Sequence, residues 1–207
     1  MVRRIALLAV LALTLAPAAL ADGDPASDYL LGQSTFVPPD IGVPPAYAQQ
    51  LETAVRDAKA RGYTIRVALI GSEYDMGSVT VLYEKPTQYA RFLGQELSLI
   101  YKQPLLIVMP NGLAVSIKGK LAPREQAVVA AITPPGKDGT AIASTGTTAV
   151  LKLAAAAGIV IPRPPLAATG RSSPGSSAGR DRIIIAAVGL GVVLLIALFA
   201  LYRRRRA

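Results

Sequence analysis

Two carboxylates stand two residues apart in a short loop rich in glycine and serine. Glu73 and Asp75 lie in the segment Gly71–Ser78. Carboxylate oxygens are ligands of hard cations such as Ca²⁺ and Mg²⁺. An aspartate in such a loop is also a common cap of the following helix, because its side chain accepts hydrogen bonds from free backbone N–H groups. The sequence therefore predicts either a cation site at Glu73 and Asp75 or a helix cap, of which the cap is favoured.

Other chemistry is limited by the residue types that the chain lacks. It contains no histidine and no cysteine. This excludes Ser-His-Asp and Cys-His nucleophiles and the usual His/Cys zinc site. The loop from Gly71 to Gly77 is not a phosphate-binding loop, because the Lys-Ser/Thr pair is absent. We therefore expect no catalytic set and no cofactor other than calcium or magnesium.

A second group of acidic residues stands near the start of the chain. Asp22, Asp24 and Asp28 lie in a segment rich in proline and glycine. We expect these three carboxylates to be exposed. Residues 22–47 should form an extended arm or loop, and the arm is apolar enough to pack on the domain that follows.

Residues 22–161 have the patterns of one α/β domain. A helical pattern over residues 45–61 ends at Gly62, and an alternating strand pattern follows over residues 64–71. The continuous apolar run Leu105–Met109 predicts a strand that is buried on both faces. The other expected elements are a short helical piece at 79–83, a hairpin at Asn111-Gly112 leading to a strand over 113–118, and helices over 86–100, 122–132 and 140–157.

The predicted fold class is therefore α/β, with a small mixed sheet of about three to four strands flanked by helices. Ligands of open α/β sheets bind beyond the carboxyl ends of the strands. That edge carries Glu73 and Asp75 after one expected strand and Asn111 after another. We therefore expect any ligand site of the domain at this edge.

The first 21 residues have the pattern of a secretory signal peptide. Arg3 and Arg4 precede an apolar run over residues 5–15, and Ala19 and Ala21 are spaced for cleavage after Ala21. An uncleaved signal anchor is the alternative. Both interpretations place the middle of the chain outside the cytoplasmic membrane.

Residues 183–202 are apolar, carry no charge and precede four arginines at 203–206. A helix of that length spans about 30 Å, the thickness of the hydrocarbon core of a bilayer. A buried core helix is the alternative, but a core helix would not end in four arginines. We expect a single-pass type I protein of the cell membrane, with residues 203–207 as a cytoplasmic tail. The Ala187-x-x-x-Gly191 spacing permits pairing of such helices.

The net charge of +9 comes from the ends of the chain and not from the domain. Residues 22–161 hold twelve basic and twelve acidic residues, so the domain is neutral. The basic excess is therefore a topology signal, and we expect no nucleic-acid partner. Residues 162–182 are rich in Pro, Gly, Ser and Arg, which predicts a disordered linker. Residues 159–161 should form an edge strand or pack under this linker.

Two stretches of the domain carry a resemblance to the TPM domain, a family of small α/β domains often anchored by a C-terminal membrane helix. They are Gly62–Ile70 and Gln103–Met109, followed by Asn111-Gly112 and by Ile117-Lys118-Gly119. The resemblance covers about residues 45–120. It implies phosphatase-like activity, calcium binding, or a role in assembling or repairing membrane complexes.

The whole chain is also similar to an uncharacterised family of single-pass membrane proteins of actinobacterial type. Asp28–Gln33 and Lys102–Leu106 carry that similarity, which implies no function.

We therefore expect a membrane-tethered domain without catalysis, which binds an envelope or membrane protein on the outer face of a bacterial cytoplasmic membrane. One alternative is a metal-dependent hydrolase of phosphate esters that uses Glu73 and Asp75. A structural cap or an envelope sensor is the other.

Overall fold

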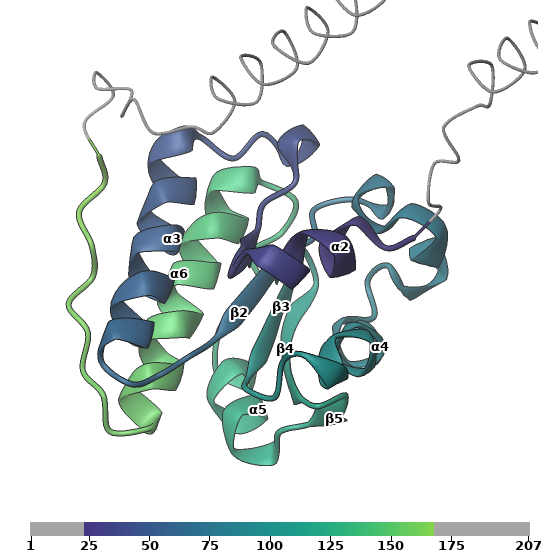
Figure 1. Cartoon of the computed structure of the whole chain (residues 1–207). Helices are drawn as coiled ribbons and strands as arrows, with labels where there is room; N and C mark the ends of the chain where they lie inside the picture. Colours follow the sequence, from purple (N-terminus) through teal and green to yellow (C-terminus); the bar gives the residue numbers. More distant parts are fainter. Residues whose placement is uncertain (1–22, 168–207) are drawn as a thin grey trace, which may run out of the picture. The chain divides into compact units, whose positions relative to one another are not determined.

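The computed structural model describes residues 23–167 (Figure 1). The predicted signal peptide (1–21), the predicted transmembrane helix (183–202) and the predicted tail (203–207) lie outside the described residues. Within residues 23–167, no helix has the length and apolar character needed to cross a membrane.

The centre of the domain is a five-stranded mixed sheet with the strands in sequence order. The first three strands are parallel, and the last two are antiparallel to their neighbours. The strands are β1 (Thr35–Phe36), β2 (Arg66–Leu69), β3 (Leu105–Met109), β4 (Gly112–Ile117) and β5 (Lys120–Leu121).

Helices cover both faces of the sheet (Figure 1). Of the five α-helices within residues 23–167, four begin with proline, whose fixed φ and missing N–H suit the first helical turn. The helices are α2 (Pro25–Gly32), η1 (Pro39–Ile41), α3 (Pro45–Ala60), η2 (Glu73–Leu82), α4 (Pro86–Glu96), η3 (Leu97–Leu99), α5 (Pro123–Ala130) and α6 (Gly139–Ala156).

Two separate hydrophobic cores result from this layered arrangement. On one face, α3, α5 and α6 pack on side chains such as Val67 and Val108. On the other face, α2, η2 and α4 pack on side chains such as Ala68 and Ile107. The side chains of successive residues in β2 and β3 thus pack in opposite cores, because side chains alternate between the two faces along a strand. The prediction that β3 is buried on both faces is confirmed.

The α/β class with a mixed, helix-flanked sheet is also confirmed, but the sheet has five strands where three to four were expected. The added strands, β1 and β5, have two residues each and carry no periodic pattern. The hairpin between β3 and β4 turns at Pro110 and Asn111, because Gly112 already pairs with Met109. The expected turn at Asn111-Gly112 is thus displaced by one residue.

Two further segments differ from expectation. The arm contains the helix α2, since Asp24 caps it and Pro25 begins it.

The linker was expected to begin at residue 162, but residues 159–167 run as an extended strap along α3 and α6 (Figure 1). Ile161 lies in the α3-side core, and the Gln50 side chain donates a hydrogen bond to the Pro164 carbonyl. The packed chain therefore continues beyond Ile161 to Pro164, which is buried although the composition had assigned it to the linker.

Candidate functional site

The loop after β2 uses the Asp75 carboxylate to bind its own backbone. Asp75 Oδ2 accepts hydrogen bonds from the N–H groups of Gly71 and Ser72, both at 2.8 Å. With the Ser72 side chain this forms a capping box at the start of η2. Asp75 is buried in that role. The structure thus shows the helix cap that was the favoured interpretation of this carboxylate.

Glu73 is exposed on the first turn of η2, and the structure gives it no hydrogen bond among residues 23–167. Within the same range, no three Asp, Glu, His or Cys side chains converge in a way that could hold a metal ion. A cation at Glu73 and Asp75 therefore stays a prediction, and the geometry adds no third ligand to it.

The chain itself fills the carboxyl edge of the parallel strands. The Tyr83 hydroxyl donates to the Gly71 carbonyl at 2.9 Å, and the Asn111 side chain donates to the Glu84 carbonyl. Gly71 lies directly against the Ile41 side chain, which leaves no room for a Cβ. Of the polar residues that the sequence placed at this edge, Asp75 and Asn111 thus bind backbone groups of the chain, whereas Glu73 stays exposed.

The exposure predicted for Asp24 is wrong. Asp24 is buried, whereas exposure was expected. Its carboxylate accepts from the Ala26 N–H at 3.0 Å and from the Tyr89 hydroxyl at 2.9 and 2.8 Å to its two oxygens. The Asp24-Pro25 pair, a cap followed by proline, is the signal that could have located the cap. Its partner Tyr89, from α4, has no such local signal.

Burial determines the acid–base behaviour of this pair. It raises the pKa of Asp24 to about 6, against the opposing effect of the hydrogen bonds from Tyr89 and the Ala26 N–H. The nearby carboxylates of Glu96 and Asp28 contribute to the rise, and the pKa of about 6 results from all of these effects together. Burial also raises the pKa of Tyr89 well above its usual range, so that the phenol stays protonated and donates. The pair joins α2 to α4 and has the character of a structural contact.

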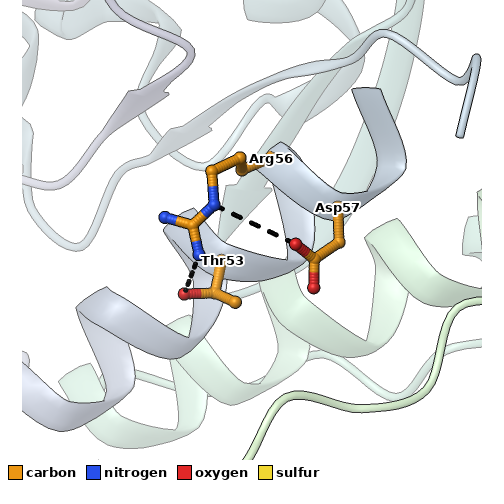
Figure 2. A network of polar contacts seen from close by, with 3 residues as sticks. All are labelled: Thr53, Arg56 and Asp57. Atoms are coloured by element: carbon orange, nitrogen blue, oxygen red, sulfur yellow. Dashed lines mark hydrogen bonds and ion pairs between the residues drawn. The ribbon is translucent and has the colours of Figure 1, made fainter. Parts of the chain in front are cut away.

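A cavity of about 310 Å³ lies beside the start of the edge strand β1. Its charged lining comes from α3 and comprises Glu52, Arg56 and Lys59. Figure 2 shows the Arg56 side chain held on α3, where it donates to the Thr53 hydroxyl at 3.2 Å and lies 3.9 Å from Asp57. The remaining lining residues are Tyr29, Gln33, Ser34, Thr35 and Val55.

Three large apolar side chains are exposed at the end of α2, in η3 and directly after η3. We name Leu31, Leu99 and Ile100 the α2–η3 surface; all three are exposed, and Leu99 is 90% exposed. The Arg66 side chain connects α2 to the segment after η3: it donates to the Leu31 carbonyl at 3.5 Å and lies 4.2 Å from the centre of the Tyr101 ring. Helices α2 and η3 are in contact.

The described residues define an α/β protein with a five-stranded mixed sheet between two layers of helices. Comparison with known proteins yields no matching family model, no matching curated protein and no matching solved structure.

Proposed function

We propose that this chain is a membrane-tethered domain that binds a protein partner outside the cytoplasmic membrane. The observation that carries the proposal is the α2–η3 surface. Large apolar side chains are exposed there on two elements that contact each other. Apolar patches of this kind are typical of protein interaction sites.

Two features of the sequence support the location. The signal-peptide pattern of residues 1–21 exports the domain, and residues 183–202 with the four following arginines hold it at the membrane. The equal numbers of acidic and basic residues in 22–161 favour a protein partner over nucleic acid.

The hydrolase alternative has no comparable support. It requires Asp75 to hold a metal ion or to act on a substrate. Both hydrogen bonds of that carboxylate in the structure go to backbone N–H groups, through a single oxygen. Withdrawing that oxygen would leave two N–H groups at a helix start without an acceptor.

Photocrosslinking in native membranes tests the proposal. A photoreactive amino acid replaces Leu99 in the full-length protein, and Lys137 in a matched control, because both are exposed and lie on different elements. We expect one protein adduct in several-fold excess from position 99. Equal labelling from both positions, or no protein adduct at all, would contradict the proposed function.

A further inference from the structure

Strand β1 is an open edge of the sheet. In the register of β1 and β2, Thr35 lies opposite Val67, and the Val67 N–H donates to the Ser34 carbonyl at 2.9 Å. In a parallel ladder the groups that bond β2 therefore belong to Ser34 and Phe36, and the N–H and C=O of Thr35 point away from the sheet. Within residues 23–167, neither of these two groups has a backbone partner.

The 310 Å³ cavity lies directly beyond this edge. Its lining includes Tyr29 from α2, which covers one face of the sheet, and Val55 from α3, which covers the other. A cavity lined from both helical layers and from Thr35 itself has to lie at the side of the sheet, where a next strand would pair. Thr35 lines this cavity and is only 8% exposed, so its two free backbone groups do not lie on an open surface.

The pleat of β1 determines which way an added residue would point. Phe36 packs in the α2-side core, so Thr35 has its side chain on the α3 side. Residues directly opposite each other on neighbouring strands share a face. A residue paired with Thr35 would therefore direct its side chain towards α3 and the charged lining of the cavity.

The charges there favour an acidic side chain. Lys59 and Arg56 outnumber Glu52 in the lining of the cavity. Arg56 is near Asp57, at 3.9 Å, whereas Lys59 has no ion pair among the described residues. A carboxylate on the incoming residue would supply that partner.

From this geometry we propose that β1 receives an extended peptide segment of a partner protein as a sixth strand of the sheet. An acidic residue opposite Thr35 pairs with Lys59, and backbone hydrogen bonds to Thr35 supply affinity that does not depend on sequence. The inference rests on the proposed function, since the segment belongs to the partner that the α2–η3 surface binds. Residues 31–35 are consecutive in the chain and lead from Leu31 of that surface to Thr35, the first residue of β1.

A direct binding experiment tests the added strand. The probe is the peptide STVTETVTS-amide with fluorescein on its amino terminus, and its counterpart has lysine in the central position. Fluorescence anisotropy measures both on the full-length protein in detergent. We expect saturable binding of the acidic peptide, at least tenfold tighter than that of the lysine peptide. No saturable binding, or no preference between the two peptides, overturns the proposal.

Two variants locate the binding. Thr35→Pro removes the outward N–H but no hydrogen bond to β2, so circular dichroism should show an intact fold while peptide binding is lost. Lys59→Glu should reverse the preference for the acidic peptide, and Arg61→Glu, an exposed change two residues away, should leave it unchanged. If Thr35→Pro does not fold, the comparison of Lys59→Glu with Arg61→Glu decides alone. Equal effects of these two variants overturn the proposal.

Crosslinking separates failure of this inference from failure of the proposed function. A photoreactive residue at Tyr29, in the lining of the cavity, should yield the same partner adduct as position 99 in native membranes, and Thr35→Pro should remove the adduct from position 29. An adduct only from position 99 overturns the added strand and leaves the proposed function standing. A crosslink from position 29 to the same chain also overturns the added strand, because it shows the edge to be occupied internally.

Discussion

At the scale of single residues, Asp24 has two structural roles. It caps α2 through the Ala26 N–H and fixes α2 to α4 through the Tyr89 hydroxyl. A buried carboxylate loses its hydration, and these two donors replace only part of it. This is why burial raises the pKa of Asp24 to about 6, from the ordinary value of 3.8. The charged form is thus tolerated in the fold at a cost.

This shifted pKa makes stability depend on pH in a defined direction. A carboxyl whose pKa is higher in the folded than in the unfolded state stabilises the fold fully below pH 3.8, and this stabilisation is lost as the pH rises through about 6. A shift of this size corresponds to about 3 kcal/mol. We expect the free energy of unfolding of the full-length protein, from urea titrations in detergent, to fall by that order between pH 4 and pH 7.

The variant Asp24→Asn should lack this slope, because it retains an oxygen for the Ala26 N–H but does not titrate. The exposed Asp40→Asn is the matched control and should keep the pH profile of the natural protein. Parallel pH profiles for the natural protein and Asp24→Asn would show that Asp24 does not cause the dependence.

Asp75 and Asp24 also show where sequence prediction works for single side chains and where it fails. Asp75 binds groups three and four residues away, so the local pattern predicted its cap. Asp24 binds a hydroxyl 65 residues away. No local pattern encodes that contact, and composition alone placed Asp24 on the surface. Likewise, the unpaired backbone of Thr35 depends on the sheet register and not on the identity of the residue.

At the scale of the elements, the kink within η2 fixes the start of α2. Gly77 has φ 54° and ψ −119°, a conformation that is accessible almost only to glycine. A Cβ at this position would overlap the Gly23 carbonyl oxygen. The chain can therefore bring η2 against the residue before Asp24 only where a side chain is missing.

The variant Gly77→Ala should lower the free energy of unfolding by about 2–4 kcal/mol, because it adds both backbone strain and a steric overlap. The control is Gly32→Ala at the end of α2, where a Cβ would meet no atom within 4 Å. That change should alter stability by less than about 0.5 kcal/mol. Thermal unfolding followed by circular dichroism measures both, and equal effects would contradict the role assigned to the kink.

The strap of residues 159–167 offers a second matched pair. Ile161 is 7% exposed and belongs to the α3-side core, whereas Val160 is 77% exposed. Ile161→Ala should cost about 2–4 kcal/mol of unfolding free energy in urea titration, because it leaves a cavity in the core. Val160→Ala should be nearly neutral. A neutral Ile161→Ala would mean that the strap does not contribute to the stability of the fold.

Elements with strong periodicity were predictable, and short ones were not. The helix α3 has enough residues for its apolar positions to define a face, β2 lies in a segment with an alternating pattern, and β3 is a continuous apolar run. The two-residue strands β1 and β5 exist only because a neighbouring strand supplies hydrogen bonds. The strap has the composition of a linker and packs because α3 and α6 offer it a surface. These segments are defined by tertiary contacts that no local pattern contains.

At the scale of the whole molecule, the two edges of the sheet differ in what lies beside them. Both edge strands have two residues, but β5 begins with an exposed lysine, a common means of preventing unwanted pairing. The edge strand β1 has the 310 Å³ cavity beside it, lined by residues of α2 and α3. The lysine of β5 thus disfavours pairing at one edge, and the other edge is the one for which an added strand is proposed.

The predicted placement of the domain outside the membrane can be tested directly, because the chain contains no cysteine. A single cysteine introduced as Lys137→Cys lies on an exposed position of the domain, and one introduced as Ala207→Cys lies in the predicted cytoplasmic tail. A maleimide that cannot cross membranes should label position 137 in intact cells. It should label position 207 only after lysis, because the arginines at 203–206 retain the tail inside. The natural protein, without cysteine, gives the background. Labelling of position 207 in intact cells, or protection of position 137, would reverse the topology and remove the export on which the proposed function depends.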